Sequence, residues 1–536
     1  MPLLESPTLQ QRIDPIFAAF GAPDSPGCAV AVARAGECLF SAGYGLASVE
    51  HQVPVTPQTV FRIASVTKQF TVTAVLMLAA AGRLTLDDDV RSLVPELAAL
   101  RQRVSLEHLM RNTSGLPDFL ELLRLGGLGL EARLGRDAML QCLARNTHFN
   151  FEPGSRFLYS NSNFLLLGLV AERVAGCTLD EFLQRQVFVP LGMHRTALVV
   201  AGDMPVPGLA TPYVRDDLGR LRRAMHGFDH GGEGGLVSCA GDLLLWLAEL
   251  QRPTHLPPDL LAQLASPTRL ARGAASPYSR GLEHSRVNGL ASIGHGGLWP
   301  GFRTELLHLA ESQLSVVVIS NAGHSNPYRL ARDVARALLP PARAATPSPE
   351  AVPGLQAMTG TWLCRRTPAL FDLGLVDGEP CATQWGVPFV LEPQADGRWW
   401  PLRGAYEFSL RVRDANTLEV DVGAGDVVHF ERLAGRAGAD ADLPGRYVCA
   451  DNGAQWDIAL ASGATDECRV QVCGPHATGG KPWRLRGVVP GLVEVMGQSY
   501  WMNTSQLACV ERDAHHRIVA LRVHSSRIRG LRFVRV

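Results

Sequence analysis

Ala64-Ser65-Val66-Thr67-Lys68-Gln69-Phe70 is the stretch of sequence that decides the fold and the chemistry of this chain. It opens an apolar segment that runs to Ala81 and stops at Gly82, a residue type that commonly ends helices. Apolar residues fall on nearly every face of the segment, which predicts a helix buried in a core. Residues three apart share a helical face, so we expect Lys68 one turn from the Ser65 hydroxyl, at the helix N-terminus.

Such a pair can support nucleophilic catalysis. A serine hydroxyl becomes a nucleophile when a neighbouring base takes its proton, and a desolvated lysine can be that base. Of the 51 basic residues only Lys68 and Lys481 are lysines, which leaves 51 − 2 = 49 arginines. A buried ammonium can lose its proton and a guanidinium cannot, so a lysine at this place indicates base chemistry. The alternative, a coincidental Ser-x-x-Lys, is disfavoured by the scarcity of lysine.

A second polar segment, Tyr159-Ser160-Asn161, follows the turn signal Pro153-Gly154 and precedes an apolar helical pattern. A tyrosine beside a buried lysine can share its proton, and an asparagine amide can bind a peptide group. The alternative interpretation is an aromatic anchor with a helix cap.

A third segment, His295-Gly296-Gly297-Leu298, lies on an expected strand. Paired glycines allow another backbone to approach closely, and a histidine donates or accepts a hydrogen bond near neutral pH. Taken alone, this segment is also typical of an ordinary turn.

Composition excludes several classes of function. The 536 residues carry 51 basic and 51 acidic side chains, so the electrostatic footprint of a nucleic-acid or anionic-membrane binder is missing. No cationic start precedes an apolar run at the N-terminus, and the apolar runs fall short of the ~18 residues of a membrane span. The eleven cysteines form no C-x-x-C pair. We therefore expect reduced thiols, no metal site and a cytoplasmic protein.

The pattern changes after residue 340. Residues 1–340 alternate between buried strands, such as Cys28–Arg34 and Leu314–Asn321, and helical patterns, such as Phe164–Val174 and Asp242–Leu250. A Pro/Ala-rich linker is expected over 341–353. The remainder alternates as antiparallel β structure and looks duplicated, because Gly360–Cys364 is echoed by Gly445–Cys449. We expect two small barrels, over 354–434 and 443–536.

The three motifs in this order resemble the penicillin-recognising serine hydrolases, which include class C β-lactamases, D,D-carboxypeptidases, esterases and D-aminopeptidases. Leu109–Leu116, Gly82–Asp88 and Phe151–Ser155 are similar to that group as well. Within the group, the likeness is greatest to the bacterial D-aminopeptidases. It implies an α/β (α+β) catalytic domain of the β-lactamase/transpeptidase type followed by two lipocalin-like antiparallel β-barrels, and a homodimer.

The resemblance also implies roles for particular residues. Ser65 would be the acylated nucleophile, Lys68 its general base and Tyr159 a partner in the proton relay. Asn161 would bind the substrate's amide, and Gly297 and Leu298 would line the site. The backbone N–H groups of Ser65 and Leu298 would form the oxyanion hole. No metal or organic cofactor is required for acyl transfer of this kind.

His295 stands where penicillin-binding members usually place a lysine. A neutral histidine removes the attraction for a substrate carboxylate and suits a substrate whose nearby charge is a free ammonium. The implied function is release of N-terminal D-residues from short peptides, amides or esters. The alternatives are an esterase on the same machinery and, in a different class, a binding or assembly protein with a disused site.

The resemblance further implies that a loop of the last barrel enters the active site with an acidic residue for the substrate's amine. The matching stretch, 495–510, holds no carboxylate. Its bulkiest residues are Tyr500 and Trp501, which we expect to act as an aromatic wall. Glu233 or another acid would then have to bind the amine.

Overall fold

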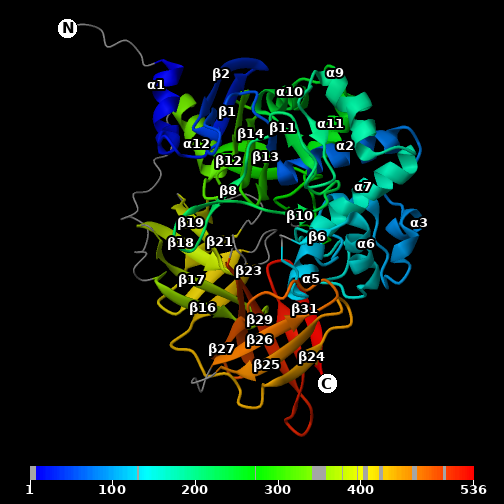
Figure 1. Cartoon of the computed structure of the whole chain (residues 1–536), viewed down its shortest axis with the longest axis vertical. Coiled ribbons are helices and arrows are strands. Elements are labelled where there is room, and N and C mark those ends of the chain that lie inside the picture. Colours follow the sequence, from blue (N-terminus) through cyan, green and yellow to red (C-terminus); the bar gives the residue numbers. More distant parts are fainter. Residues whose placement is uncertain are drawn as a thin grey trace, which may run out of the picture.

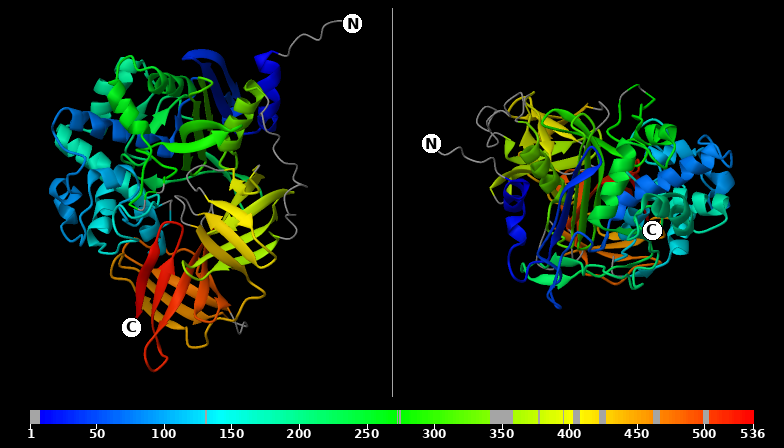
Figure 2. Two further views of the ribbon diagram at one scale, coloured as in Figure 1. Left: turned by 180° about the vertical axis from the view of Figure 1, so that it is seen from behind. Right: turned by 90° about the horizontal axis from the view of Figure 1, so that it is seen from above.

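A computed structural model describes residues 8–129, 132–271, 273, 275–340, 358–376, 378–394, 396–402, 408–421, 427–461, 467–498 and 503–536. Its upper part in Figure 1 is a sheet flanked by helices, and two barrels lie below it, coloured yellow and orange to red. Figure 2 shows from behind that both barrels lie on the same side of the sheet domain. The predicted fold class is therefore confirmed.

The central sheet joins the two ends of the first 340 residues. Its strand order is β12-β13-β14-β15-β1-β2 and every neighbouring pair is antiparallel. The strands are β1 (Cys28–Arg34), β2 (Glu37–Tyr44), β12 (Glu283–Val287), β13 (Leu290–Trp299), β14 (Phe302–Leu309) and β15 (Leu314–Ser320). Strand β1 is an unbroken apolar run because helices α10 and α12 cover the sheet and leave neither face of β1 in water.

Most of the helices lie in the chain between β2 and β12. They are α2 (Thr67–Ala80), α3 (Val90–Leu93), α4 (Leu106–Met110), α5 (Phe119–Leu125), α6 (Arg136–Arg145), α7 (Asn161–Ala175), α8 (Leu179–Leu183), α9 (Val189–Leu191), α10 (Ala240–Gln251) and α11 (Pro258–Ala265). Helices α1 (Leu9–Ile13) and α12 (Pro327–Leu338) lie outside this segment. The predicted buried helix is α2, which ends before Gly82 at a φ of +68°.

Short strands complete the sheet domain. They pair as β3 (Leu46–Ser48) with β4 (Val53–Pro54), β6 (Arg133–Leu134) with β10 (Gly227–Phe228), and β8 (Tyr213–Arg215) with β9 (Leu221–Arg223). A three-stranded sheet contains β5 (Phe61–Arg62), β11 (Leu236–Ser238) and β7 (Ala197–Leu198). Because β5 ends three residues before Ser65, this small sheet anchors the turn that carries the predicted nucleophile.

Each β domain is a closed barrel of eight described strands. The first contains β16 (Gly360–Cys364), β17 (Ala369–Val376), β18 (Glu379–Gln384), β19 (Val387–Pro393), β20 (Trp399–Pro401), β21 (Ser409–Val412), β22 (Thr417–Asp421) and β23 (Val427–Arg432). The second contains β24 (Gly445–Val448), β25 (Gln455–Leu460), β26 (Glu467–Cys473), β27 (Trp483–Val489), β28 (Leu492–Gln498), β29 (Asn503–Arg512), β30 (Ile518–His524) and β31 (Arg529–Arg535).

The echoed sequences form the closure of both barrels. In the first, the Trp362 indole donates to the Met358 carbonyl at 2.8 Å, and the Arg432 guanidinium lies 5.3 Å from the indole ring. In the second, the Tyr447 hydroxyl donates to the carbonyl four residues earlier at 2.7 Å, and Arg535 lies 5.7 Å from its ring. The first and last strands pair in each case, so the repeat reflects one closure used twice.

The second barrel shares a hydrophobic core with the sheet domain. Leu122 and Leu125 of α5 belong to the same buried cluster as Trp456 and Tyr447 of the barrel. The Trp456 indole N–H also donates to the Leu125 carbonyl at 2.9 Å. A smaller apolar cluster joins the two barrels. The predicted linker lies outside the described residues, and the predicted domain limits stay predictions.

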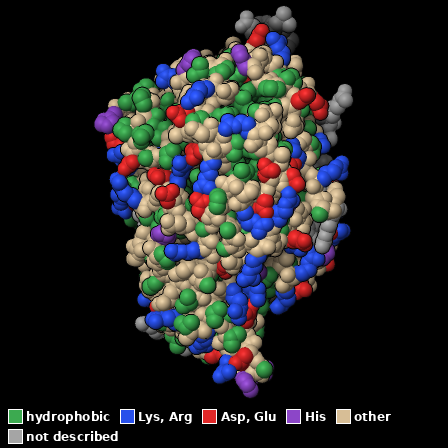
Figure 3. All heavy atoms as spheres, turned by 90° about the vertical axis from the view of Figure 1, so that its right-hand side faces the viewer, with side chains coloured by type: hydrophobic (Ala, Val, Ile, Leu, Met, Phe, Trp, Pro, Cys, Tyr) green, Lys and Arg blue, Asp and Glu red, His purple; other side chains and the backbone are tan. Residues whose placement is uncertain are grey.

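Two further observations concern the class of protein. In the described part of the chain, no single helix is long and apolar enough to cross a membrane, although α7 and the helical segment Leu179–Leu191, bent by 74°, pass that test as a pair. All eleven cysteines are free thiols. On the face shown in Figure 3, basic and acidic side chains are scattered among polar and apolar ones.

Candidate active site

Ser65 lies in a strained turn between β5 and α2. Residues Ala64–Val66 form a 3₁₀ turn, and Ala64 has a φ of +48°, a region that residues with a side chain rarely occupy. Strand β13 runs beside this turn, and a Cβ on Gly297 would lie 2.2 Å from the Ile63 carbonyl oxygen. Only glycine therefore allows β13 to approach the turn so closely. Ser65, Gly297 and Leu298 line the same cavity.

Lys68 is completely buried, and its ammonium nitrogen contacts three oxygen atoms. The nitrogen lies 2.9 Å from Ser65 Oγ, 2.9 Å from Asn161 Oδ1 and 2.7 Å from the Glu233 carbonyl oxygen. A neutral amine has two N–H groups, enough for Asn161 and Glu233, and its lone pair then faces the serine hydroxyl. The predicted proximity of Ser65 and Lys68 is present in the structure.

Burial is the main reason that Lys68 can be neutral. The pKa of the ammonium is lowered to about 7 in total: burial lowers it most and Arg527 lowers it too, whereas Glu233, Asp118 and Glu283 oppose the shift. Burial conversely raises the pKa of the Glu233 carboxyl group. A lysine that is half deprotonated near neutral pH is matched to general-base work.

Tyr159 is 3% exposed, and its ring lies close to two basic side chains. Its ring centroid is 4.9 Å from the Lys68 nitrogen and 4.8 Å from the guanidinium carbon of Arg527. The ring lines the cavity beside Ser65. The structure thus brings Tyr159 to the predicted site, and its part in proton transfer stays a prediction.

Asn161 is oriented by a buried carboxylate. Asp118 Oδ2 accepts hydrogen bonds from the Asn161 backbone N–H at 2.7 Å and from its amide Nδ2 at 2.9 Å. The amide oxygen of Asn161 therefore faces Lys68. Asp118 Oδ1 caps α5 by accepting from the backbone N–H groups of Leu120 and Glu121, which fixes the carboxylate between α5 and α7.

The Leu109–Leu116 segment braces the Tyr159–Asn161 segment. Asn112 Oδ1 accepts from the Ser160 backbone N–H at 3.0 Å and from Asn163 Nδ2 at 2.8 Å. Asn163 Oδ1 in turn accepts from the Ser114 hydroxyl at 2.6 Å. This motif supports the site from behind and does not line the cavity.

His295 lies behind Tyr159 and is not part of the cavity wall. Its Nε2 is 3.1 Å from the Tyr278 hydroxyl, its Nδ1 is 2.6 Å from the Gly296 carbonyl oxygen, and its ring centroid is 6.1 Å from that of Tyr159. Burial and the nearby Lys68 lower its pKa to about 3, so the ring is neutral, as expected. Direct contact between His295 and substrate stays a prediction, because the described contacts place its ring against aromatic side chains.

The cavity measures about 540 Å³ and is formed by the sheet domain and both barrels. The sheet domain contributes the polar groups around Ser65, and the first barrel contributes Trp385 and Phe389. The second barrel contributes Thr504, Ser505 and Arg527. A substrate bound at Ser65 is therefore enclosed by residues more than 400 positions apart in the chain.

Sequence reasoning missed three residues of this site: Asp118, Tyr278 and Arg527. Asp118 has the sequence pattern of a helix cap, which indicates a structural role only, and no motif surrounds Tyr278. Arg527 comes from the turn between β30 and β31, outside the stretch 495–510 that the resemblance indicates as the incoming loop; Thr504 and Ser505 of that stretch line the cavity as well. Tyr500 and Trp501 lie outside the described residues.

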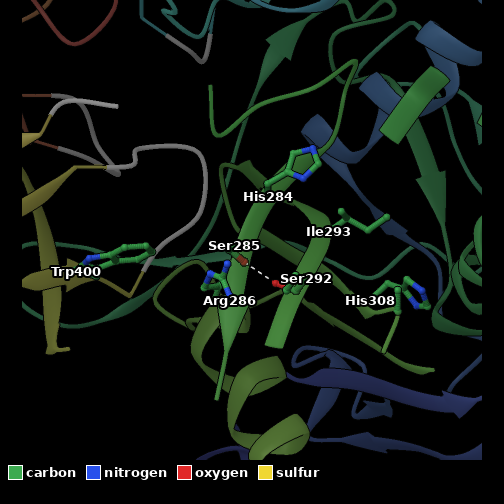
Figure 4. Close-up of a pocket in the computed structure, with 9 residues that line it drawn as sticks. His284, Ser285, Arg286, Ser292, Ile293, His308 and Trp400 are labelled. Atoms are coloured by element: carbon green, nitrogen blue, oxygen red, sulfur yellow. Dashed lines mark hydrogen bonds between the residues drawn. The ribbon is translucent and has the colours of Figure 1, made fainter. Parts of the chain in front are cut away.

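A second cavity, of about 350 Å³, lies between the β12–β13 edge and the first barrel (Figure 4). His284, Ser285 and Arg286 face it from β12, and Trp400 of β20 lies across from them. The Ser285 hydroxyl lies 2.8 Å from that of Ser292 and accepts from the Arg332 guanidinium, which cannot act as a base. Within the described residues, no group of three or more His, Cys, Asp or Glu side chains is arranged to hold a metal ion.

Comparison with known proteins agrees with this geometry. Residues 13–340 match the Beta-lactamase family. The chain belongs to that family. It is 33% identical to a D-aminopeptidase of Gluconobacter oxydans over 55% of this chain and 56% of that protein, so the match spans little more than half of that relative. It is 29% identical to a D-aminopeptidase of Brucella ovis over 72% of each chain.

A solved structure extends the likeness to the fold. The octameric penicillin-binding protein homologue from Pyrococcus abyssi superposes with a TM-score of 0.57 at 22% identity, over 79% of this chain and 99% of that one. The resemblance predicted from the motifs is confirmed, and the chain is a serine hydrolase by family.

Proposed function

We propose that this protein is a D-stereospecific aminopeptidase that acylates Ser65 and releases N-terminal D-residues from short peptides, amides or esters. The observation that carries the proposal is the buried Lys68 amine, 2.9 Å from Ser65 Oγ and with a pKa lowered by burial to about 7. The D-aminopeptidase names of the two relatives support the substrate class.

In the proposed reaction, the neutral Lys68 amine takes the Ser65 proton while Oγ forms a bond to the substrate's carbonyl carbon. The backbone N–H groups of Ser65 and Leu298 stabilise the resulting oxyanion. The C–N bond breaks as the leaving amine takes this proton from Lys68, with Tyr159 as the relay. Water then attacks the acyl carbon while Lys68 takes a proton from the water. The bond to Ser65 Oγ breaks as Oγ regains a proton from Lys68, and the amino acid is released.

The substrate's ammonium group needs a carboxylate, and five acidic residues line the cavity: Asp118, Glu121, Asp229, Glu233 and Glu305. Three of them pair with arginines and Glu233 accepts from the Gly231 backbone N–H. Among the described residues, no group donates a hydrogen bond to the Asp229 carboxylate or forms an ion pair with it. We therefore assign the ammonium to Asp229 in preference to Glu233.

The binding partners and the cellular location are also part of the proposal. We propose small peptides, amides or esters as the substrates and assign no role to nucleic acid or membrane. A cytoplasmic location is proposed because eleven free thiols suit a reducing compartment. The expected homodimer also stays a proposal.

The test is a substrate panel with wild type, Ser65→Ala, Lys68→Arg and Asp229→Asn. We expect D-Ala-p-nitroanilide to be hydrolysed faster than its L-isomer, and Ser65→Ala and Lys68→Arg to lose at least about a hundredfold in kcat, because arginine keeps the charge but cannot act as base. Asp229→Asn should raise KM for D-Ala-p-nitroanilide and leave p-nitrophenyl acetate unaffected. Efficient turnover of the ester with none of the anilide would favour the esterase. Lack of turnover of every substrate would favour the binding protein.

A further inference from the structure

The turn between β30 and β31 brings a cation from the second barrel into the catalytic centre. Asn150 of the catalytic domain holds this turn, since its Nδ2 donates to the Arg527 carbonyl at 3.1 Å and its Oδ1 accepts from the Arg529 backbone N–H at 2.8 Å. The Arg527 guanidinium then lies 3.1 Å from Asp118 Oδ2 and over the ring of Tyr159. Two domains thus share one ion pair at the site.

Asp118 needs this cation. The carboxylate is fully buried, and a buried charge is costly unless it is paired and hydrogen-bonded. Its Oδ2 accepts from Asn161 twice and from Arg527 once. Continuous hydrogen bonds therefore run from Arg527 through Asp118 and Asn161 to Lys68, and from there to Ser65 Oγ.

We propose that Arg527 is a positioning residue for acyl transfer, which holds Asp118 and Asn161 so that the Lys68 amine faces Ser65, and that the second barrel is thereby an obligatory part of the catalytic centre. The inference rests on the Ser65–Lys68 pair of the proposed function, and it does not depend on preference for D-residues.

The consequence for pH follows from the charges around Lys68. Among the described residues, seven groups face Lys68. Six come from the sheet domain: Asp118 at the α5 cap, Tyr159 just before α7, Asn161 on α7, Glu233 before β11, Glu283 on β12 and His295 on β13; the seventh is Arg527 of the second barrel. His295 is neutral above about pH 3. Arg527 lowers the pKa of Lys68, whereas Asp118 raises it. Removal of Arg527 leaves Asp118 without its cation, so the protonated form of Lys68 gains stability and the base is lost at neutral pH.

The experiment measures the rate at which a fluorophosphonate labels Ser65, as a function of pH, because this readout requires the activated serine and no particular substrate. Arg527→Met should slow labelling about tenfold at neutral pH and move the acidic limb of the profile up by about one pH unit. Arg527→Lys should restore most of the rate. The control is Arg522→Met, which removes an exposed arginine of β30 that pairs with Glu511, and should leave the profile unchanged.

A second variant separates positioning from folding. Arg527→Met with Asp118→Asn removes both charges, so the acidic limb should return to its wild-type position even if the rate stays low. The proposal would be overturned if the acidic limb of the pH profile stayed at its wild-type position in Arg527→Met. It would also be overturned if the acidic limb stayed displaced in the double variant. If Arg527→Met raised only the KM of peptides with a free carboxylate, Arg527 would be a substrate anchor and the proposal would be wrong. Wild type that is not labelled at all would instead refute the Ser65–Lys68 mechanism.

Discussion

Replacement of Gly297 by alanine is expected to disable the site while the protein stays folded. A Cβ at this position would lie 2.2 Å from the Ile63 carbonyl oxygen and 3.1 Å from Thr304 Cβ. A carbon–oxygen contact of this kind normally measures about 3.3 Å, so the structure must open by roughly 1 Å. The clash is with backbone, two residues before Ser65, and no side chain can rotate to relieve it.

The expected cost follows from that displacement. Opening the contact moves the Ser65 turn away from β13 and so separates the two N–H groups proposed for the oxyanion hole, that of Ser65 on the turn and that of Leu298 on β13. A misplacement of about 1 Å can lower the rate about a hundredfold, or about 2.7 kcal/mol of transition-state stabilisation. Overpacking of a core typically costs a further 1–3 kcal/mol of folding stability, roughly, which a protein of this size tolerates.

The assay is kcat/KM for D-Ala-p-nitroanilide and p-nitrophenyl acetate, with circular dichroism to show that the variant is folded. Gly374→Ala is the matched control, because a Cβ added to that strand glycine would meet no atom beyond its chain neighbours within 4 Å. It should match wild type with both substrates. A folded Gly297→Ala variant within about threefold of wild type would show that close approach of β13 to the turn is not needed for catalysis.

Three other predictions follow from the site. For wild type, kcat/KM should fall about tenfold per pH unit below about pH 7, because the pKa of Lys68 is lowered to about 7 and only the neutral amine can act as base; a profile flat down to pH 5 would exclude it. Nitrocefin should be hydrolysed far more slowly than D-Ala-p-nitroanilide, since neutral His295 offers no cation for its carboxylate; fast hydrolysis would point to Arg527 as the anchor. A chain cut after Pro340 should aggregate and lose activity, because the α5 face that packs on Trp456 becomes exposed and Arg527 is lost; an active, monodisperse fragment in size-exclusion chromatography would contradict this.

Features of the site that depend on neighbours in the chain could be predicted from the sequence. Ser65 lies in the 3₁₀ turn that leads into α2, so the three-residue spacing still brings it one turn from Lys68 and their contact follows from local structure. The glycines before Leu298 indicated close approach of another backbone, and the structure identifies that backbone as the turn at Ile63. The two barrels could be predicted from period-two patterning and from the echo of Gly360–Cys364 in the second half.

The charges around the nucleophile could not be predicted in the same way. Arg527 and Asp118 are 409 residues apart, and each has an ordinary local explanation, one in a turn and the other as a helix cap. Likewise, the motif identified His295, but it could not predict which way the imidazole ring points. The ring's hydrogen-bond partner is Tyr278, which comes from a segment without a motif.

The sequence by itself therefore determined the Ser65–Lys68 contact and the fold class, because local spacing and patterning act over a few residues and do not depend on the rest of the fold. Only the tertiary structure decided the electrostatics around Lys68, the base of the proposed mechanism. Burial and the net effect of Asp118, Glu233 and Arg527 set its pKa. Asp118 and Glu233 belong to the sheet domain, whereas Arg527 joins them because the second barrel packs against α5 and its turn lies over Tyr159.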